Sequence, residues 1–207
     1  MPNVLLLNGS PNANGCTFTA LKEMASTLEK EGMATEIVHV GHQDIRGCIG
    51  CGRCAQLGHC VFNDLVNKLA PKLELADGLV VGSPVYYASA NGTLTNLLDR
   101  LFFSTPFSKR MKVGAAVCSA RRAGTTATFD QLNKYFTISE MPVASGRYWN
   151  MVHGHSADDV MQDLEGLQNM RILARNMAFL IRVIAAERER NGLPAQEKEI
   201  AYTNFIR

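Results

Sequence analysis

The sequence predicts one α/β domain in which a doubly wound parallel sheet carries helices on both faces. Short apolar runs alternate with amphipathic helical patterns along the chain, which is typical of parallel sheets built from strand–helix–strand units. The 207 residues are enough to bury a sizeable core. No repeat or linker divides the chain, so we expect one domain over residues 1–190 and a polar tail over residues 191–207.

The first strand and helix follow from the spacing of apolar residues. Residues 3–7 are apolar after Asn3 and predict a buried strand, which ends in the turn-rich residues 8–15. A helix is expected over residues 17–31, because apolar side chains recur on one face and Gly32 follows as a stop signal.

The remaining elements repeat this alternation. Further strands are expected at residues 36–40, 78–82, 113–118 and 141–144, which makes five. Helices are expected at residues 64–76, around residues 94–102, at 125–137, and in one stretch from Ser156 to about residue 190. Ser156 and Asp159 form a capping-box pattern at the start of that last helix.

Composition excludes several classes of protein. The apolar fraction is 46%, the charged fraction is 19% and the formal net charge is +2, so disordered and coiled-coil chains are excluded and neither nucleic acid nor an anionic membrane is expected as a partner. No apolar stretch reaches the roughly 20 residues that span a bilayer. The first residues lack a cationic signal-peptide start, so we expect a cytoplasmic protein.

Three loops are expected to face one ligand, because ligands bind beyond the carboxyl ends of the strands in a doubly wound sheet. The first loop, residues 9–17, offers small polar side chains before a helix N-terminus, which suits a phosphate group. It lacks the lysine of a Walker loop and the dinucleotide glycine pattern. A simple glycine-rich helix cap remains the alternative.

The second and third loops carry aromatic and cationic side chains. Tyr86 and Tyr87 would frame a flat heterocycle, or would serve as half-buried packing groups. Arg121 and Arg122 would face an anionic ring, or would be solvated surface residues.

Four cysteines lie within one short loop, residues 47–61, which we expect as an insertion after the second strand. Their spacing is C-x2-C-x2-C-x5-C, and the first three match the bacterial ferredoxin pattern. The fourth comes two residues later than in that pattern, and Val61 replaces the following proline. The loop predicts a [4Fe–4S] site, with zinc and free or redox-paired thiols as alternatives. The proposed ligands are Cys48, Cys51, Cys54 and Cys60.

Several motifs together resemble a known family. They are residues 8–11 (Asn-Gly-Ser-Pro), 14–17, 82–86 (Gly-Ser-Pro-Val-Tyr), 99–100 (Asp-Arg) and 119–125. This set is similar to the flavodoxin-like NAD(P)H-dependent FMN reductase family, and the cysteine loop is similar to its iron-sulfur flavoprotein branch. The resemblance implies a flavodoxin-like five-stranded sheet that binds FMN. Asn12 and Cys16 depart from many relatives, which carry Arg and Asn there.

The resemblance also implies which residues surround the cofactor. Around the phosphate these are Ser10, Asn12, Asn14, Cys16 and Thr17. Around the isoalloxazine ring they are Pro84, Val85, Tyr86, Tyr87, Asn91, Ser119, Arg121, Arg122, Gly124 and Thr125.

The implied function is an FMN-dependent oxidoreductase whose chemistry takes place at flavin N5, so no catalytic side chain is named. Electrons would pass from NAD(P)H or a reduced protein donor to a quinone-like acceptor or a ferredoxin-like protein, with a cluster near the flavin edge as relay. The family resemblance further implies a homodimer or homotetramer. The alternatives are a flavin-binding electron carrier or redox sensor, and a thiol-regulated structural protein that binds no flavin.

Overall fold

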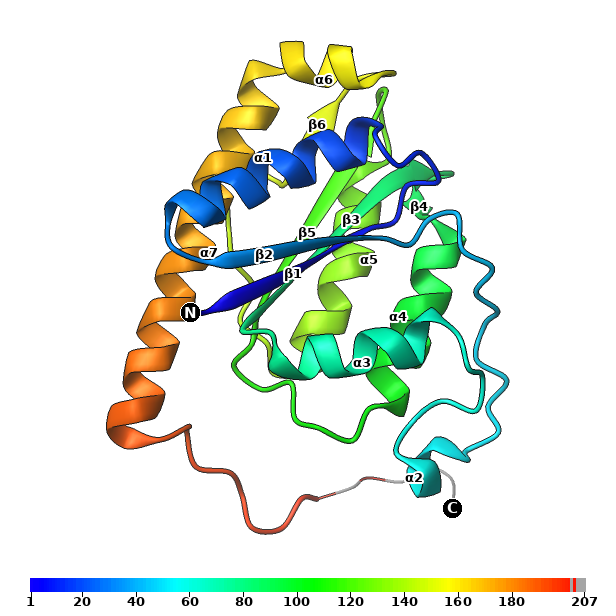
Figure 1. Cartoon of the computed structure of the whole chain (residues 1–207), viewed down its shortest axis with the longest axis vertical. Helices are drawn as coiled ribbons and strands as arrows, with labels where there is room; N and C mark the ends of the chain where they lie inside the picture. Colours follow the sequence, from blue (N-terminus) through cyan, green and yellow to red (C-terminus); the bar gives the residue numbers. More distant parts are fainter. Residues whose placement is uncertain (202, 204–207) are drawn as a thin grey trace.

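Five parallel strands form the central sheet of the computed structural model, which describes residues 1–201 and 203 (Figure 1). The spatial order β2-β1-β3-β5-β6 is the doubly wound order of flavodoxin-like sheets. The strands are β1 (Asn3–Asn8), β2 (Ala34–His39), β3 (Gly78–Tyr86), β5 (Val113–Ala120) and β6 (Met151–His153). Each adjacent pair is parallel, so the carboxyl ends of all five strands lie at the same edge.

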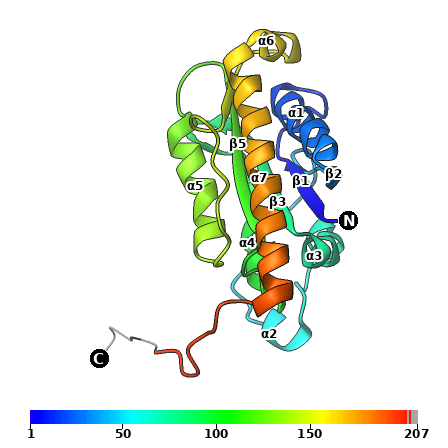
Figure 2. The same cartoon turned by 90° about the vertical axis from the view of Figure 1, so that its left-hand side faces the viewer.

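Helices cover both faces of this sheet (Figures 1 and 2). One layer contains α1 (Cys16–Lys30) and α7 (Leu164–Asn191). The other contains α3 (Leu65–Leu75), α4 (Gly92–Ser104) and α5 (Thr125–Thr137). The expected doubly wound fold with five parallel strands is therefore confirmed.

Side chains of β1 point alternately to the two faces of the sheet and so contribute to two separate hydrophobic cores. Val4 and Leu6 pack against the layer of α1 and α7, whereas Leu5 and Leu7 pack against α3 and α4. Successive side chains of a strand point to opposite faces, so an unbroken apolar run is what a strand covered on both faces requires.

The fifth strand lies later in the chain than the sequence pattern indicates. We expected it at residues 141–144, but there only Val143 makes an isolated bridge, to Gly114. The edge strand is β6, which pairs with the end of β5. Between the two segments the Asn150 side chain donates to the Ala116 carbonyl at 3.1 Å, and the Asn150 carbonyl accepts the Cys118 N–H at 2.9 Å.

The expected last helix is two helices, α6 (Ala157–Gln162) and α7. Ser156 and Asp159 form the expected capping box at the start of α6. The break occurs at Asp163, whose Oδ1 accepts the Gly166 N–H at 2.9 Å and whose Oδ2 accepts the His153 N–H at 2.7 Å. Asp163 therefore acts as the N-cap of α7, which ends one helix and begins the next. Its second oxygen also links the start of α7 to the edge strand β6.

Two short elements were not expected from the sequence. Strand β4 (Ser89–Ala90) turns back on the end of β3 as an antiparallel hairpin. Helix α2 (Cys54–Leu57) lies within the cysteine loop, between β2 and α3. In the described part of the chain, no helix has the length and apolar character needed to cross a bilayer.

Phe136 on α5 tests how much the α5 layer contributes to stability. Its ring is fully buried over Gly114 of β5, where an added Cβ would lie only 2.5 Å from the ring. We expect Phe136→Ala to lower the free energy of unfolding by about 3–5 kcal/mol, because it leaves a cavity against the sheet.

Urea denaturation followed by circular dichroism measures this change. Ile138→Ala, at the exposed end of the same helix, is the control and should cost at most about 0.5 kcal/mol. Equal losses in the two variants would contradict the packing assigned to Phe136.

Candidate functional site

A pocket of about 590 Å³ opens where the carboxyl ends of the strands meet. Its volume lies within the range of cofactor sites. Four loops form its wall, and the lining residues are Ser10, Asn12, Ala13, Asn14, Gly15, Cys16, Thr17, Pro84, Val85, Tyr86, Ser119, Ala120, Arg121, Gly154, His155 and Ser156. None of these residues is acidic, so the wall suits an anionic ligand.

The loop between β1 and α1 leaves backbone donors free at the start of a helix. Gly15 is the N-cap residue of α1 and provides no side-chain cap, and the first turn contains no acidic residue. The first N–H groups of a helix have no partner within the helix, and they lie at the positive end of its dipole. This end of α1 therefore fits a phosphate group.

Side chains and neighbouring loops fix the shape of this phosphate loop. The Ser10 N–H donates to Asn8 Oδ1 at 3.1 Å, and the Ser10 Oγ accepts the Asn12 N–H at 3.2 Å. His39, at the end of β2, places Nε2 at 2.7 Å from the Ser10 carbonyl oxygen. Gly41 follows so closely that an added Cβ would lie 2.2 Å from the Ser10 backbone. Only glycine fits there without displacing the loop.

Cys16 opens α1 with a neutral thiol. Its pKa is raised, chiefly by burial and also by the charge of Asp159, although its own backbone N–H opposes the shift. A neutral side chain does not repel a phosphate dianion. The Cys16 Sγ lies 3.6 Å from the Gly154 carbonyl oxygen, and this contact joins α1 to the loop after β6.

A hydroxyl pair closes the wall between the first and third loops. Thr17 Oγ1 and Ser119 Oγ lie 2.8 Å apart, and both residues are buried. The start of α1 and the end of β5 are thereby held together, so a group bound at the phosphate loop also meets the loop after β5.

Ten of the fifteen residues expected around the cofactor line this pocket, and five do not. Those outside it are Tyr87, Asn91, Arg122, Gly124 and Thr125. Asn91 Oδ1 accepts the Leu94 N–H and caps α4, and Gly124 has a φ of +94° where an added Cβ would lie 2.8 Å from the Val85 side chain, so both residues shape loops. Tyr87 is fully exposed at the tip of the β3–β4 hairpin.

The fourth loop, Gly154 to Ser156, is not predicted from the sequence. These residues follow β6, which we had not expected as a strand. The signal was present in the apolar pair Met151-Val152 before Gly154 and the capping box. Asp159 accepts the His155 and Ser156 N–H groups at 2.9 and 3.0 Å, and these bonds lower its pKa.

The four clustered cysteines line a second, much smaller pocket of about 20 Å³ between the cysteine loop and α4. Cys48 and Cys51 are exposed, Cys54 is half-buried and Cys60 is buried. None of the six cysteines forms a disulfide in the described structure. Three glycines between them, Gly50, Gly52 and Gly58, have φ of +63° to +70°, and these left-handed turns curl the chain around the pocket.

The sulfurs surround this pocket without meeting at one point. Among the described residues, no three Cys, His, Asp or Glu side chains are close enough to share one metal ion. Four soft thiolate donors nevertheless fit the chemistry of an iron–sulfur cluster, which distributes its ligands over several iron atoms.

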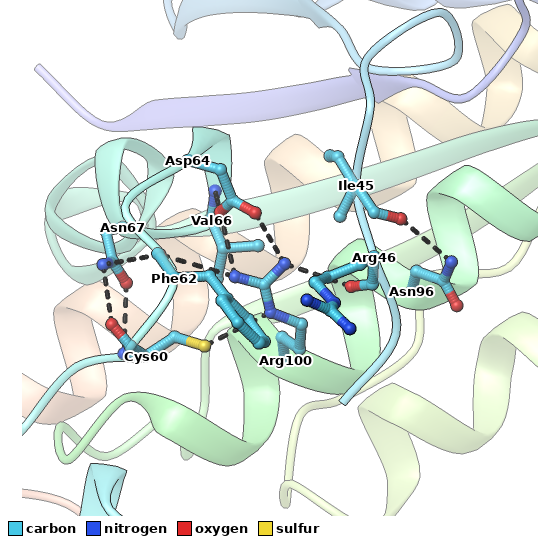
Figure 3. Close-up of polar contacts among 9 residues, drawn as sticks. All are labelled: Ile45, Arg46, Cys60, Phe62, Asp64, Val66, Asn67, Asn96 and Arg100. Atoms are coloured by element: carbon cyan, nitrogen blue, oxygen red, sulfur yellow. Dashed lines mark hydrogen bonds and ion pairs between the residues drawn. The ribbon is translucent and has the colours of Figure 1, made fainter. Parts of the chain in front are cut away.

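A buried cation anchors the cysteine loop to α4 (Figure 3). Arg100 is 1% exposed and forms a two-pronged ion pair with Asp64, at 2.6 and 3.0 Å. Its Nε–H donates to Cys60 Sγ at 3.2 Å. Burial alone would lower the pKa of Arg100, but the bonds to Asp64 and Cys60 outweigh it and raise the pKa, so the guanidinium stays charged. Asn67 of α3 adds a clamp on the Cys60 backbone, with bonds of 3.1 and 2.9 Å.

The two pockets lie toward opposite ends of the molecule. In both views α2 and the cysteine loop are at the bottom, whereas the start of α1 is in the upper half (Figures 1 and 2). The two pockets have no lining residue in common. The cysteine loop of one chain is therefore not beside that chain's phosphate pocket.

Known proteins are similar to this chain in sequence and in fold. The family model described as NADPH-dependent FMN reductase matches residues 2–156. An iron-sulfur flavoprotein of Methanocaldococcus jannaschii is 31% identical over 192 residues, which cover 87% of this chain and 98% of the relative. A relative from Methanosarcina thermophila, also named an iron-sulfur flavoprotein, is 24% identical and covers 89% of this chain and 97% of its own length.

A solved structure with the same fold aligns with the whole chain. The crystal structure of RosB with bound 8-demethyl-8-formylriboflavin-5'-phosphate has a TM-score of 0.74 at 17% identity, over 100% of this chain and 94% of RosB. At that identity the likeness shows the fold alone. The family match over three quarters of the chain and the near full-length archaeal relative show more: the chain belongs to the NADPH-dependent FMN reductase family, in its iron-sulfur flavoprotein branch.

Proposed function

We propose that this FMN oxidoreductase takes electrons from NAD(P)H or a reduced protein donor and passes them to a quinone-like or protein acceptor. The observation that carries the proposal is the uncapped start of α1, which opens into a pocket of about 590 Å³ without an acidic lining residue. Free N–H groups and the helix dipole attract a phosphate ester, and the pocket has room for a flat ring. Bound FMN supplies a hydride acceptor that releases electrons singly or in pairs.

The chain's own residues bind and orient the cofactor in this proposal. Ser10, Asn12, Asn14, Cys16 and Thr17 would surround the phosphate, since all five line the pocket. Pro84, Val85, Tyr86, Ser119 and Arg121 would contact the ring. Asn91, Gly124 and Thr125 would act by holding the loops, and Tyr87 and Arg122 would reach only a ligand that extends past the pocket.

We further propose that Cys48, Cys51, Cys54 and Cys60 hold a [4Fe–4S] cluster. The left-handed glycines support this, because they curl the loop so that all four cysteines line one pocket. The C-x2-C-x2-C spacing of the first three cysteines, which matches the bacterial ferredoxin pattern, favours a cluster over zinc.

The separation of the two pockets bears on how the electrons would travel. Electron tunnelling weakens steeply with distance, so a relay within one chain is disfavoured. We propose that the cluster exchanges electrons with the flavin of a second copy in a homodimer or homotetramer, or with a ferredoxin-like protein, in the cytoplasm.

A flavin-binding electron carrier or redox sensor is the second candidate function. The exposure of Cys48 and Cys51 favours it, because sulfurs at the surface are accessible to a protein partner. An enzyme and a carrier differ in whether NAD(P)H alone sustains turnover.

Anaerobic purification tests the main proposal. We expect one FMN, about four iron atoms and about four acid-labile sulfides per chain. Steady oxidation of NADH or NADPH with a quinone acceptor should follow. A flavin that only a reduced protein donor can reduce would instead favour the carrier, and failure to bind added FMN would refute both.

Gly41→Ala tests the phosphate loop. The new Cβ would collide with the Ser10 backbone, so the loop must move and FMN affinity should fall at least tenfold, or about 1.4 kcal/mol. Quenching of flavin fluorescence during titration of the apoprotein measures the Kd. Gly92→Ala is the matched control, because an added Cβ there meets open space. An unchanged Kd in a folded Gly41→Ala protein would contradict the assigned phosphate site.

Replacement of all four clustered cysteines by serine tests the independence of the two centres. Iron and sulfide should be lost, whereas the FMN Kd should stay within about twofold, because the two pockets share no lining residue. Chemical iron analysis and the same flavin titration measure the two quantities. Loss of FMN together with iron would show that the centres are coupled within one chain.

A further inference from the structure

Arg100 is the largest fully buried side chain among the described residues. Its N–H groups donate hydrogen bonds to residues before, within and after the cysteine loop. Nη1 donates to Asp64 at 2.6 Å and to the Arg46 carbonyl at 3.1 Å. Nη2 donates to Asp64 at 3.0 Å, and Nε donates to Cys60 Sγ at 3.2 Å. Figure 3 shows the guanidinium between the two segments that flank the cysteine loop. One side chain of α4 thus fixes both ends of the loop.

The surroundings hold the guanidinium in one orientation. Asp64 is itself fixed, because its Oδ1 accepts the Val66 N–H at 3.1 Å as the cap of α3. The Phe62 ring lies 4.9 Å from the Arg100 guanidinium carbon, in stacking range. With both terminal nitrogens engaged, the Nε–H bond is directed at the sulfur.

Cys60 differs from the other three proposed ligands. Within the described residues, it is the only one of the four whose sulfur accepts a hydrogen bond from a charged side chain. It is also the most buried of the four. A hydrogen bond from a cation to a thiolate is strong in such surroundings, because little water competes for it.

We infer that Arg100 is a positioning residue that holds Cys60 ready as a cluster ligand and raises the reduction potential of the cluster through its Nε–H···Sγ hydrogen bond. This inference rests on the proposed cluster. Reduction adds one electron from the donor to the cluster and breaks no bond at the sulfur. The added negative charge is shared with the thiolate, so a donor on that sulfur stabilises the reduced form more than the oxidised form.

Arg100→Lys tests the hydrogen bond while keeping the charge. A lysine lacks the planar fork, so it cannot bridge Asp64 and also donate to Cys60. We expect the equilibrium constant for one-electron reduction to fall about tenfold, a shift of about 59 mV to lower potential. An anaerobic dithionite titration followed by electron paramagnetic resonance of the reduced cluster measures this potential.

Two further variants complete the test: one is expected to shift the reduction potential in the opposite direction, and the other is a control that should leave it unchanged. Asp64→Asn retains a capping side chain but leaves the charge of Arg100 uncompensated, so the potential should rise. Arg46→Lys is the matched control: Arg46 lies 4.8 Å over the same Phe62 ring, and no bond links its side chain to Cys60, so the potential should stay unchanged.

Iron content separates this inference from the proposed cluster. Wild-type protein without iron would remove the cluster and this inference with it. If wild type and Arg100→Lys both contain iron, and Arg100→Lys has the same reduction potential as the Arg46→Lys control, the role of Arg100 is overturned and the cluster proposal stands. If Arg100→Lys binds FMN normally yet retains no iron, the positioning role is upheld, and the rise in Asp64→Asn decides the effect on potential.

Discussion

The parallel register of the central sheet is the constraint on which both candidate centres depend. Parallel neighbours cannot be joined by a tight turn, so each connection crosses a face of the sheet and usually forms a helix. At the carboxyl edge the Gly9 N–H donates to the Gly82 carbonyl of β3 at 2.8 Å, so the loop after β1 begins against the neighbouring strand. On the other side of the sheet, the long connection after β2 contains the cysteine loop and α3, and the loop is anchored by Asn67 of α3 and Arg100 of α4.

The sequence predicts most of this fold because apolar runs and helical spacing are local signals. Prediction from the sequence fails where a single side chain makes a bond to another part of the chain. The amide of Asn150 bonds to the edge of β5 just before the fifth strand begins, and the carboxylate of Asp163 caps a second helix where the apolar spacing continues unbroken. Neither event is visible from periodicity, because each depends on a partner that only the folded chain brings near.

The candidate sites show the same division between local and long-range information. Small polar residues before a helix and clustered cysteines are local patterns, and both lead to a pocket in the structure. The Gly154 to Ser156 loop was missed because its strand was misplaced. The separation of the two pockets was also missed, since it depends on the path of the chain from β2 to α3. Arg100 lies forty residues from Cys60, so its bond to that sulfur has no sequence signature.

The two centres handle negative charge in different ways. The phosphate pocket uses dipoles and neutral groups, since its helix start is uncapped, its wall has no acidic residue and the Cys16 thiol stays protonated. The cysteine pocket instead contains the buried guanidinium of Arg100, whose charge is neutralised by Asp64. Because Asp64 occupies both terminal nitrogens, the sulfur of Cys60 meets one polarised N–H group rather than a free charge. The electrostatic surroundings of that sulfur therefore depend on the intact Arg100–Asp64 ion pair in the α3–α4 layer. The phosphate loop, toward the other end of the molecule, does not depend on that ion pair.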